Sequence, residues 1–310
     1  MKNRIIHIFA IILLSTTVYS RPIKISGIIK DSENGRPVSF ANVAIVEIEK
    51  GTTSDYNGIF DLEIDSTDLN SNLNISCLNY KDFKIKISKL LIGKSNEILL
   101  ENFSYEISEI VVSTKKKKHK EIELNKLKKS EINGMLTCDN LPKMYARYFP
   151  FEPRFEKMQY IQYLNIGFRN DQQKNKSKVR IRIFSNDYEN NKPDIDILRE
   201  DLIIIAKPGI NKIDISNFNI SLPKEGIFIA VEWLIVEENK YDWLTYNQFK
   251  IKKTETKYGP ILGANYHQES FTWLYWAGYW EKYEREVPMV HPKIKAGSYF
   301  DSAISLTLSN

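Results

Sequence analysis

The stretch from Lys24 to Tyr80 constrains the fold of this 310-residue chain more than any other part of the sequence. Short runs of apolar and β-branched residues alternate there with turn residues at regular offsets. Ala41, Val43 and Ile45 recur at every second position, so they lie on one face of a strand. Short strands punctuated in this way are typical of a small antiparallel β-sandwich.

The turn positions of this stretch each have a mechanical reason. Gly27 interrupts a strand, where a missing side chain marks a bulge or a close backbone approach. Gly35 ends an Asn-Gly dipeptide that tolerates positive φ, and Pro37 presets the entry into the next strand. Asp55 can accept hydrogen bonds from backbone amides two residues on, and Gly58 can adopt the left-handed conformation. We therefore expect positive φ at Gly58 and hydrogen bonds to Asp55 within the same turn.

The pattern resembles a known family. Its most specific elements are Gly35, Pro37, Ala41, Gly51-Thr52, Asp55, Gly58 and Phe60. They are similar to those of the carboxypeptidase regulatory-like domain, a transthyretin-type β-sandwich. That domain occurs as a non-catalytic module on secreted metallocarboxypeptidases and at the N-terminus of TonB-dependent outer-membrane receptors. Asn79 departs from the family, which usually has Gly there, but Asn also tolerates positive φ.

The remaining length excludes a complete receptor of that kind. The segment Tyr105–Thr114 resembles the lead into a receptor plug, but the residues after it amount to about one ordinary domain. A receptor barrel alone needs about twenty-two strands of roughly ten residues. The resemblance therefore implies the receptor's front module without its channel.

The N-terminus has the layout of a secretory signal peptide. Lys2 and Arg4 precede an apolar run over 5–14, and small residues follow over 15–20. The alternative is a retained signal anchor, but the apolar run is short for a membrane span. We therefore expect export to the periplasm, the outer-membrane surface or the extracellular space, with no transmembrane span once the signal is removed. The expected divisions are a signal peptide over 1–20, the regulatory-like β-sandwich over 21–114, a basic linker and lead-in over 115–156, and a C-terminal β-sandwich over 157–310.

The positive charge of the chain is concentrated in one tract. Of the formal net charge of +5, two charges belong to Lys2 and Arg4. The tract 115–120 holds five lysines, so the rest of the chain is slightly acidic. This distribution argues against a nucleic-acid partner. The tract could contact anionic lipid or glycan, or form a solvated spacer, which we favour. We expect 115–120 to be exposed and unpaired, and 121–132 partly fits a short helix.

The β pattern returns from about residue 157 and predicts a second, larger sandwich of jelly-roll type, so the chain is expected to be all-β. Arg180 and Arg182 alternate with apolar residues, which indicates a half-exposed strand. Residues 227–236 form an apolar run typical of a central strand, with Glu232 inside it. An isolated carboxylate there would cost several kcal/mol. We therefore expect Glu232 to be paired, with Arg180 and Arg182 as candidate partners.

Motifs for catalysis and metal binding are missing from the sequence, and we expect neither an enzyme nor a cofactor. None of the four histidines has a Glu three positions on, and there is no H-E-x-x-H or G-x-S-x-G motif. Cys77 and Cys138 could form a disulfide, but a buried thiol is the simpler interpretation of Cys77. The acids Asp194, Asp196, Glu200 and Asp201 could hold calcium, although a solvated loop explains them better.

An aromatic stretch supplies the one candidate ligand site. The candidate ligand-binding residues are the aromatic side chains Trp273, Tyr275, Trp276, Tyr279 and Trp280. In a strand, Trp273 and Tyr275 face one way and Trp276 the other, and Gly278 suggests a bulge. Rings left outside the core could stack on the C–H face of a sugar, whereas covered rings would simply be core, which we favour.

The sequence as a whole predicts an exported, non-catalytic binding protein of the bacterial cell envelope. Polysaccharide is the expected ligand class. The alternative is a structural or assembly module that binds envelope proteins through its sheet edges. An uncharacterised hydrolase is the third hypothesis.

Overall fold

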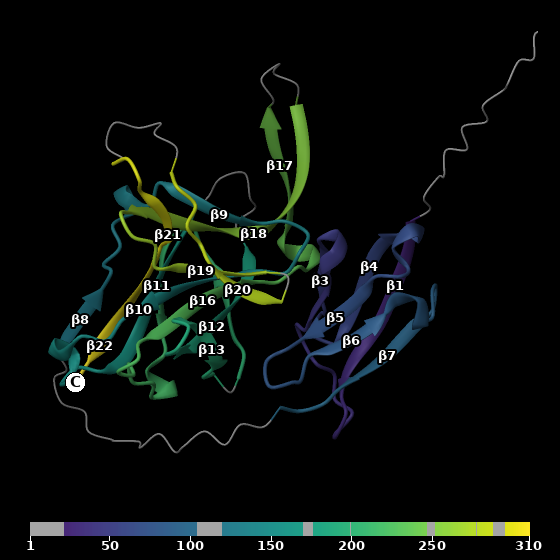
Figure 1. Ribbon diagram of the computed structural model, residues 1–310, viewed down its shortest axis with the longest axis horizontal. Coiled ribbons are helices and arrows are strands. Elements are labelled where there is room, and N and C mark those ends of the chain that lie inside the picture. Colours follow the sequence, from purple (N-terminus) through teal and green to yellow (C-terminus); the bar gives the residue numbers. More distant parts are fainter. Residues whose placement is uncertain are drawn as a thin grey trace, which may run out of the picture.

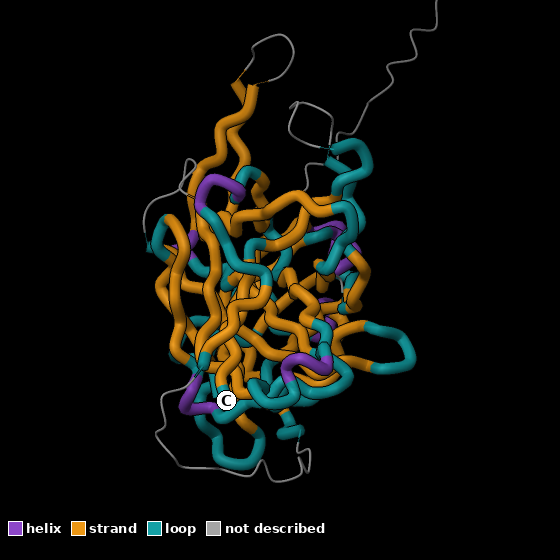
Figure 2. The backbone as a smooth tube through the Cα atoms, turned by 90° about the vertical axis from the view of Figure 1, so that its left-hand side faces the viewer, coloured by secondary structure: helices purple, strands orange, loops and turns teal. Residues whose placement is uncertain are grey.

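The computed structural model describes residues 22–103, 120–169, 176–198, 200–246, 252–276, 278–287 and 295–310. The expected signal peptide and the lysines at 115–118 lie outside these residues. The chain forms two β-sandwiches, with the N-terminal one at the right of Figure 1 and the larger one at the left. The prediction of an all-β fold is confirmed. In the described residues, helix is limited to three-residue 3₁₀ turns, which lie between the strands in Figure 2.

The N-terminal domain packs a three-stranded sheet against a four-stranded one. The first sheet has the order β4 (Ile59–Asp65), β1 (Pro22–Asp31), β7 (Ser95–Leu100). The second has the order β3 (Lys50–Thr53), β2 (Asn42–Ile45), β5 (Asn72–Ser76), β6 (Phe83–Lys86). Alternate residues such as Ile25, Val43 and Phe60 meet in one buried core between the sheets, as the period-two pattern predicts.

The turns of this domain form as predicted. Gly58 has φ 74°, and the Asp55 carboxylate accepts hydrogen bonds from the amides of Asn57 and Ile59, both at 2.8 Å. At Gly27 the feature is a close approach, because a Cβ there would lie 2.6 Å from the Asn96 carbonyl oxygen. Asn79 adopts φ 67°, so it replaces glycine in its turn.

Gly58→Ala should lower the free energy of unfolding by roughly 1–3 kcal/mol, because it adds strain at positive φ and places a Cβ 2.5 Å from the Ile29 carbonyl oxygen. Gly35→Ala is the matched control, since Gly35 has φ 71° but open space around its Cβ position. Denaturant titration of both variants measures the difference. Equal losses would show that the contact with Ile29 is unimportant.

The C-terminal domain packs a seven-stranded sheet against an eight-stranded one. The first has the order β13 (Lys192–Asp196), β12 (Ser177–Asp187), β16 (Ile227–Trp233), β10 (Met144–Phe149), β19 (Thr272–Trp276), β20 (Tyr279–Lys282), with β14 (Leu202–Ala206) also paired to β12. The second has the order β17 (Lys240–Tyr246), β18 (Lys252–His267), β11 (Tyr160–Arg169), β22 (Ile304–Ser309), β8 (Glu121–Leu124). Beside that path, β15 (Gly209–Asp214) pairs with β11, while β9 (Gly134–Cys138) and β21 (Tyr299–Ser302) pair with β18.

The start of this domain differs from the predicted boundary. The range 115–156 was expected to be a linker, but β8, β9 and β10 belong to the C-terminal sheets. The short helix expected over 121–132 is instead β8 followed by the 3₁₀ turn Lys129–Glu131. β8 is only four residues long and pairs with β22 through its backbone. The charged residues around it gave no apolar alternation from which a strand could be predicted.

The two domains pack directly against each other. Thr53 at the end of β3 donates a backbone hydrogen bond to the Ile235 carbonyl at 3.1 Å, and the Ile235 amide donates to Thr53 Oγ1 at 2.8 Å. Gly51 fits closely on Pro142, because a Cβ at Gly51 would lie 2.5 Å from Pro142 Cδ. The junction is therefore built from specific contacts on both sides.

Candidate functional site

The seven-stranded sheet curls strongly, so that its two edges approach each other. Phe184 on β12 and Trp280 on β20 are separated by three intervening strands, which span about 19 Å in a flat sheet. Their ring centroids nevertheless lie 5.3 Å apart in an edge-to-face arrangement. The edge strands β13 and β20 come within 8 Å of each other, Cα to Cα. The sheet is therefore a half-barrel, and mouths of barrels are frequent ligand sites.

The concave face of this half-barrel has an apolar interior of its own. Phe228 and Ala230 of β16 point into it, whereas Ile229 and Val231 point into the main core. The members of this second cluster are Met144, Ala146, Phe184, Phe228 and Ala230, with Tyr148, Trp273, Tyr275 and Trp280 packed against them. The aromatic stretch thus contributes three rings to the interior of the half-barrel.

A charged network lies on the same face, next to the N-terminal domain. Glu232 is 1% exposed, and its Oε2 lies 3.5 Å from Arg180 Nη1 and 3.4 Å from Arg182 Nη1. Asn42 of the N-terminal domain donates to Glu232 Oε1 at 2.5 Å, and Arg180 donates to the Phe40 carbonyl at 2.5 Å. The predicted pairing of Glu232 is confirmed. The prediction of a half-exposed strand is wrong at Arg180, which is fully buried because the other domain covers it.

Acidic side chains of the C-terminal domain complete the network. Asp201 Oδ1 lies 3.1 Å from Arg180 Nε, and Asp196 Oδ2 lies 2.5 Å from Arg182 Nε. Desolvation opposes ionisation of Glu232, but Arg180, Arg182 and Asn42 outweigh it, so the pKa of Glu232 is lowered. The balance is opposite at Asp196, where desolvation prevails and raises the pKa.

The N-terminal domain faces the half-barrel with the turn between β5 and β6. The Tyr80 hydroxyl donates to Asp31 Oδ2 at 3.0 Å, which anchors this turn to β1. Lys81 and Asp82 follow Tyr80 at the junction. Lys81 Nζ pairs with Glu101 Oε2 at 3.0 Å, within its own domain.

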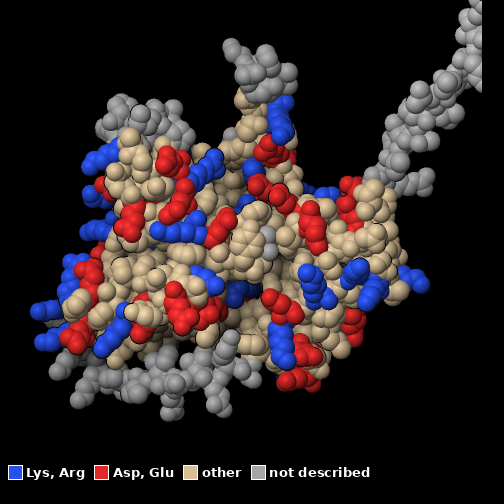
Figure 3. All heavy atoms as spheres, viewed as in Figure 1, with Lys and Arg blue, Asp and Glu red and all other residues tan. Residues whose placement is uncertain are grey.

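A cavity of about 430 Å³ lies between the two domains at the mouth of the half-barrel. Figure 3 shows the surface hollowed there, with acidic and basic side chains around the hollow. The N-terminal domain lines it with residues such as Asn42, Asn79 and Asp82, and the C-terminal domain with Arg182, Asp194, Tyr275 and Trp280. A second space of about 430 Å³ shares Asn42, Ser76, Asp82 and Tyr275 with the first. We call the two spaces together the interdomain cleft.

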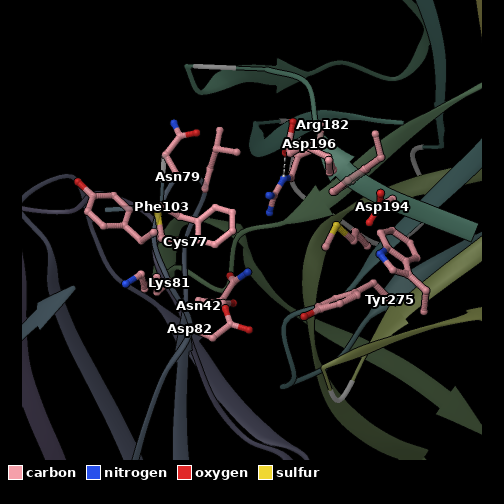
Figure 4. A pocket seen from close by; sticks show the side chains of 17 residues that line it. Asn42, Cys77, Asn79, Lys81, Asp82, Phe103, Arg182, Asp194, Asp196 and Tyr275 are labelled. Atoms are coloured by element: carbon pink, nitrogen blue, oxygen red, sulfur yellow. Dashed lines mark hydrogen bonds and ion pairs between the residues drawn. The ribbon is translucent and has the colours of Figure 1, made fainter. Parts of the chain in front are cut away.

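Tyr275 and Trp280 are the two aromatic candidates that line the interdomain cleft. Their ring centroids are 5.2 Å apart and their planes meet at 59°, so they form a corner rather than a flat platform. Figure 4 shows Tyr275 directed across the cleft toward Asp82. Burial, together with the charge of Asp82, raises the pKa of Tyr275 to about 12, so its hydroxyl keeps its proton.

The other three aromatic candidates lie elsewhere. Trp273 packs edge-to-face on Phe228 with 6.2 Å between centroids. Trp276 donates from Nε1 to Glu281 Oε1 at 2.9 Å, and Tyr279 is 51% exposed. The expected bulge at Gly278 is instead the turn between β19 and β20, with φ 91°.

The cleft also contains residues that the sequence did not single out. Asn42 and Asp82 come from the N-terminal domain, and their importance depends on which surface the other domain covers. Asp194 was considered only as a calcium ligand in a loop, but it belongs to strand β13. No local sequence signal distinguishes these residues from ordinary polar surface residues.

The remaining reactive side chains are protonated thiols or belong to ion pairs, and one of them, Cys77, lines the cleft. Cys77 and Cys138 are free thiols, and burial raises their pKa values to about 11 and about 12, so both remain protonated. Asp301 lies 3.9 Å from His267 Nε2 but forms its ion pair with Arg147. Within the described ranges, His, Cys, Asp and Glu form no group of three or more placed to hold a metal ion. Asp196 and Asp201 pair with arginines instead of forming a calcium loop.

Comparison with known proteins identifies the first domain only. No curated protein matches the chain significantly, and no family model matches the C-terminal half. Among the described residues, no helix is both long and apolar enough to cross a membrane. The match that exists covers the turns and strands described above: residues 25–112 are a CarboxypepD_reg-like domain.

Proposed function

We propose that the protein is a non-catalytic binding protein of the bacterial cell envelope that holds a saccharide in the interdomain cleft. The observation that carries this proposal is the corner formed by Tyr275 and Trp280 inside a cavity of about 430 Å³. Ligand pockets commonly have this size and combine apolar walls with a few polar groups. A sugar ring has the matching chemistry, because its C–H face packs on an aromatic ring while its hydroxyls need polar partners.

Both domains supply polar groups around the rings. Asn42, Asn79 and Asp82 lie on one side, and Asp194 on the other. Backbone groups and these side chains together can accept and donate the hydrogen bonds that sugar hydroxyls lose on leaving water. Localisation to the envelope rests on the signal-like N-terminus alone.

The competing role, assembly through sheet edges, has less support from the open edges of the N-terminal domain. β6 presents Lys84 and Lys86, and β4 presents Asp61 and Glu63. Charges along an edge strand oppose pairing with another chain. The charges on these two strands therefore count against assembly through them, while the cleft remains available for recognition.

Trp280→Leu should weaken saccharide binding at least tenfold, because leucine keeps apolar contact with Phe184 but has no ring face. Aromatic anchors commonly contribute about 1–3 kcal/mol. A glycan array with the purified protein identifies a ligand, and calorimetry on wild type and variant measures the loss. Tyr279→Leu is the matched control, since Tyr279 is exposed outside the cleft.

Three results would contradict the proposal. One is the absence of any saccharide ligand on the array. Another is an equal loss of affinity in Tyr279→Leu and Trp280→Leu. The third is cleavage of the bound saccharide, which chromatography of the recovered ligand would detect and which would point to a hydrolase.

A further inference from the structure

One edge of the seven-stranded sheet is formed by a strand with apolar side chains only. β14 has the sequence Leu-Ile-Ile-Ile-Ala and pairs with β12. Ile205 is 54% exposed, whereas Leu202 and Ile204 pack against the main core. Other edge strands, such as β4, β6, β8 and β17, carry charged side chains, which oppose pairing with another chain. β14 lacks this protection.

The register of β14 leaves two of its residues with open backbone groups. Lys178 of β12 lies opposite Ile205, but its N–H and C=O both bond to the side chain of Asn239 and so point away from β14. Because the direction of these groups alternates along a strand, the pairs Lys178–Ile205 and Arg180–Ile203 exchange no hydrogen bonds. The N–H and C=O groups of Ile203 and Ile205 therefore point outward, and they form no hydrogen bond with another described residue.

The open edge is closed immediately after β14. Lys207 N–H donates to Asn211 Oδ1 at 3.0 Å, and Asn211 Nδ2 donates to the Lys207 carbonyl at 2.6 Å. The Asn211 side chain thus occupies the backbone groups that would continue the edge. Within β14, the open groups belong to Ile203 and Ile205, which lie symmetrically on either side of Ile204.

A second copy of the same edge matches this arrangement. When two β14 strands run antiparallel about a two-fold axis at Ile204, Ile203 of one copy lies opposite Ile205 of the other. Each such pair can exchange both of its N–H···O bonds. The exposed Ile205 side chain then packs beside Ile203 of the second copy, as apolar cross-strand pairs do.

The charges that flank the strand favour the same register. Asp201 precedes β14, and the exposed Lys207 follows it. In the register centred on Ile204, Asp201 of each copy lies opposite Lys207 of the other, and opposite charges across antiparallel strands are stabilising. Asp201 Oδ1 is 3.1 Å from Arg180 Nε, but its side chain remains 32% exposed, so it can also meet a second cation.

We propose that the protein forms a symmetric dimer in which the β14 edges of two copies pair antiparallel about Ile204 and join two seven-stranded sheets into one. The partner that this surface fits is another copy of the same chain. This inference is independent of what the interdomain cleft binds. Because the shared edge is short, dimerisation is expected to be reversible and dependent on concentration.

Sedimentation velocity over a dilution series of the purified protein tests this proposal. The sedimentation coefficient of wild type should rise with concentration from the value of a monomer to that of a dimer. Ile205→Lys should weaken dimerisation about tenfold or more, because a lysine on an edge strand opposes pairing with another chain. Ile59→Lys is the matched control, since Ile59 is 49% exposed on β4 of the other domain. The control should dimerise as wild type does.

A charge variant tests the register. Lys207→Glu places an acid opposite Asp201 of the second copy and should weaken dimerisation several-fold, less so at high salt. Lys224→Glu makes the same change at another exposed lysine outside β14 and should leave dimerisation unchanged. The substituted side chains are exposed, so the variants should fold, which circular dichroism checks.

Each outcome either supports or overturns the proposal. A wild-type protein that stays monomeric at every concentration overturns it, and the edge is then open to a segment of a different protein. A dimer that persists in Ile205→Lys also overturns it, because the contact then lies elsewhere. A dimer weakened by Ile205→Lys but not by Lys207→Glu contradicts the register centred on Ile204.

Discussion

Glu232→Ala is expected to lower the free energy of unfolding by about 3–5 kcal/mol, the range found when one partner of a buried ion pair is removed. The substitution leaves Arg180, which is 0% exposed, and Arg182 with less negative charge around them. It also removes the acceptor for the Asn42 amide at the domain junction. Urea denaturation followed by circular dichroism measures the loss.

Glu238→Ala provides the matched control for this prediction. Glu238 pairs with Lys178 at 2.7 Å, but both side chains are substantially exposed, so the loss should be no more than about 1 kcal/mol. Similar losses in the two variants would contradict the view that the Glu232 network is energetically important.

The effect of Glu232 should also depend on pH. Its pKa is lowered in the folded protein, so its ionisation stabilises the fold above the pH at which a glutamate titrates in the unfolded chain. This stabilisation is lost as the pH falls through the lowered pKa of the folded state. The stability difference between wild type and Glu232→Ala should therefore shrink in that acidic range, and a pH-independent difference would count against the assignment.

Trp273→Ala is expected to lower the free energy of unfolding by about 3 kcal/mol, at the lower end for buried tryptophans because the ring is only partly buried. Trp273 packs on Phe228 inside the half-barrel, so its removal leaves a void that the curled sheet cannot easily close. Thermal and denaturant unfolding of the purified variant give the value.

Tyr279→Ala is the control, because the ring is 51% exposed and lies outside that interior. Its stability should stay within about 0.5 kcal/mol of wild type, as is usual for surface substitutions. A large loss in Tyr279→Ala, or none in Trp273→Ala, would mean that the interior of the half-barrel is wrongly assigned.

Local features were predictable from sequence because their causes are local. The turn at Gly58 follows from a residue that tolerates positive φ and an aspartate that bonds nearby amides. The pairing of Glu232 was predictable because an apolar strand cannot hold a lone carboxylate. The partners Arg180 and Arg182 could be named because they lie on another strand of the same domain.

Features that depend on the other domain were not predictable. Alternation shows which face of β12 holds the arginines, but it cannot show whether water or a second domain covers that face. The same limit applies to Asn42 and Asp82, which belong to the cleft only because the domains meet there. The ring corner of Tyr275 and Trp280 required the pairing of β19 with β20 and the curl of the sheet.

The hydrogen bond between Asn42 and Glu232 has a consequence for how this chain can change over evolutionary time. The two residues stand 190 positions apart and belong to different domains, yet each satisfies a buried polar group of the other. The N-terminal module is therefore not freely interchangeable with other copies of its fold. A copy without a hydrogen-bond donor at position 42 would leave the buried Glu232 carboxylate of the neighbouring domain without one of its partners. Substitutions at the two positions are therefore expected to occur together.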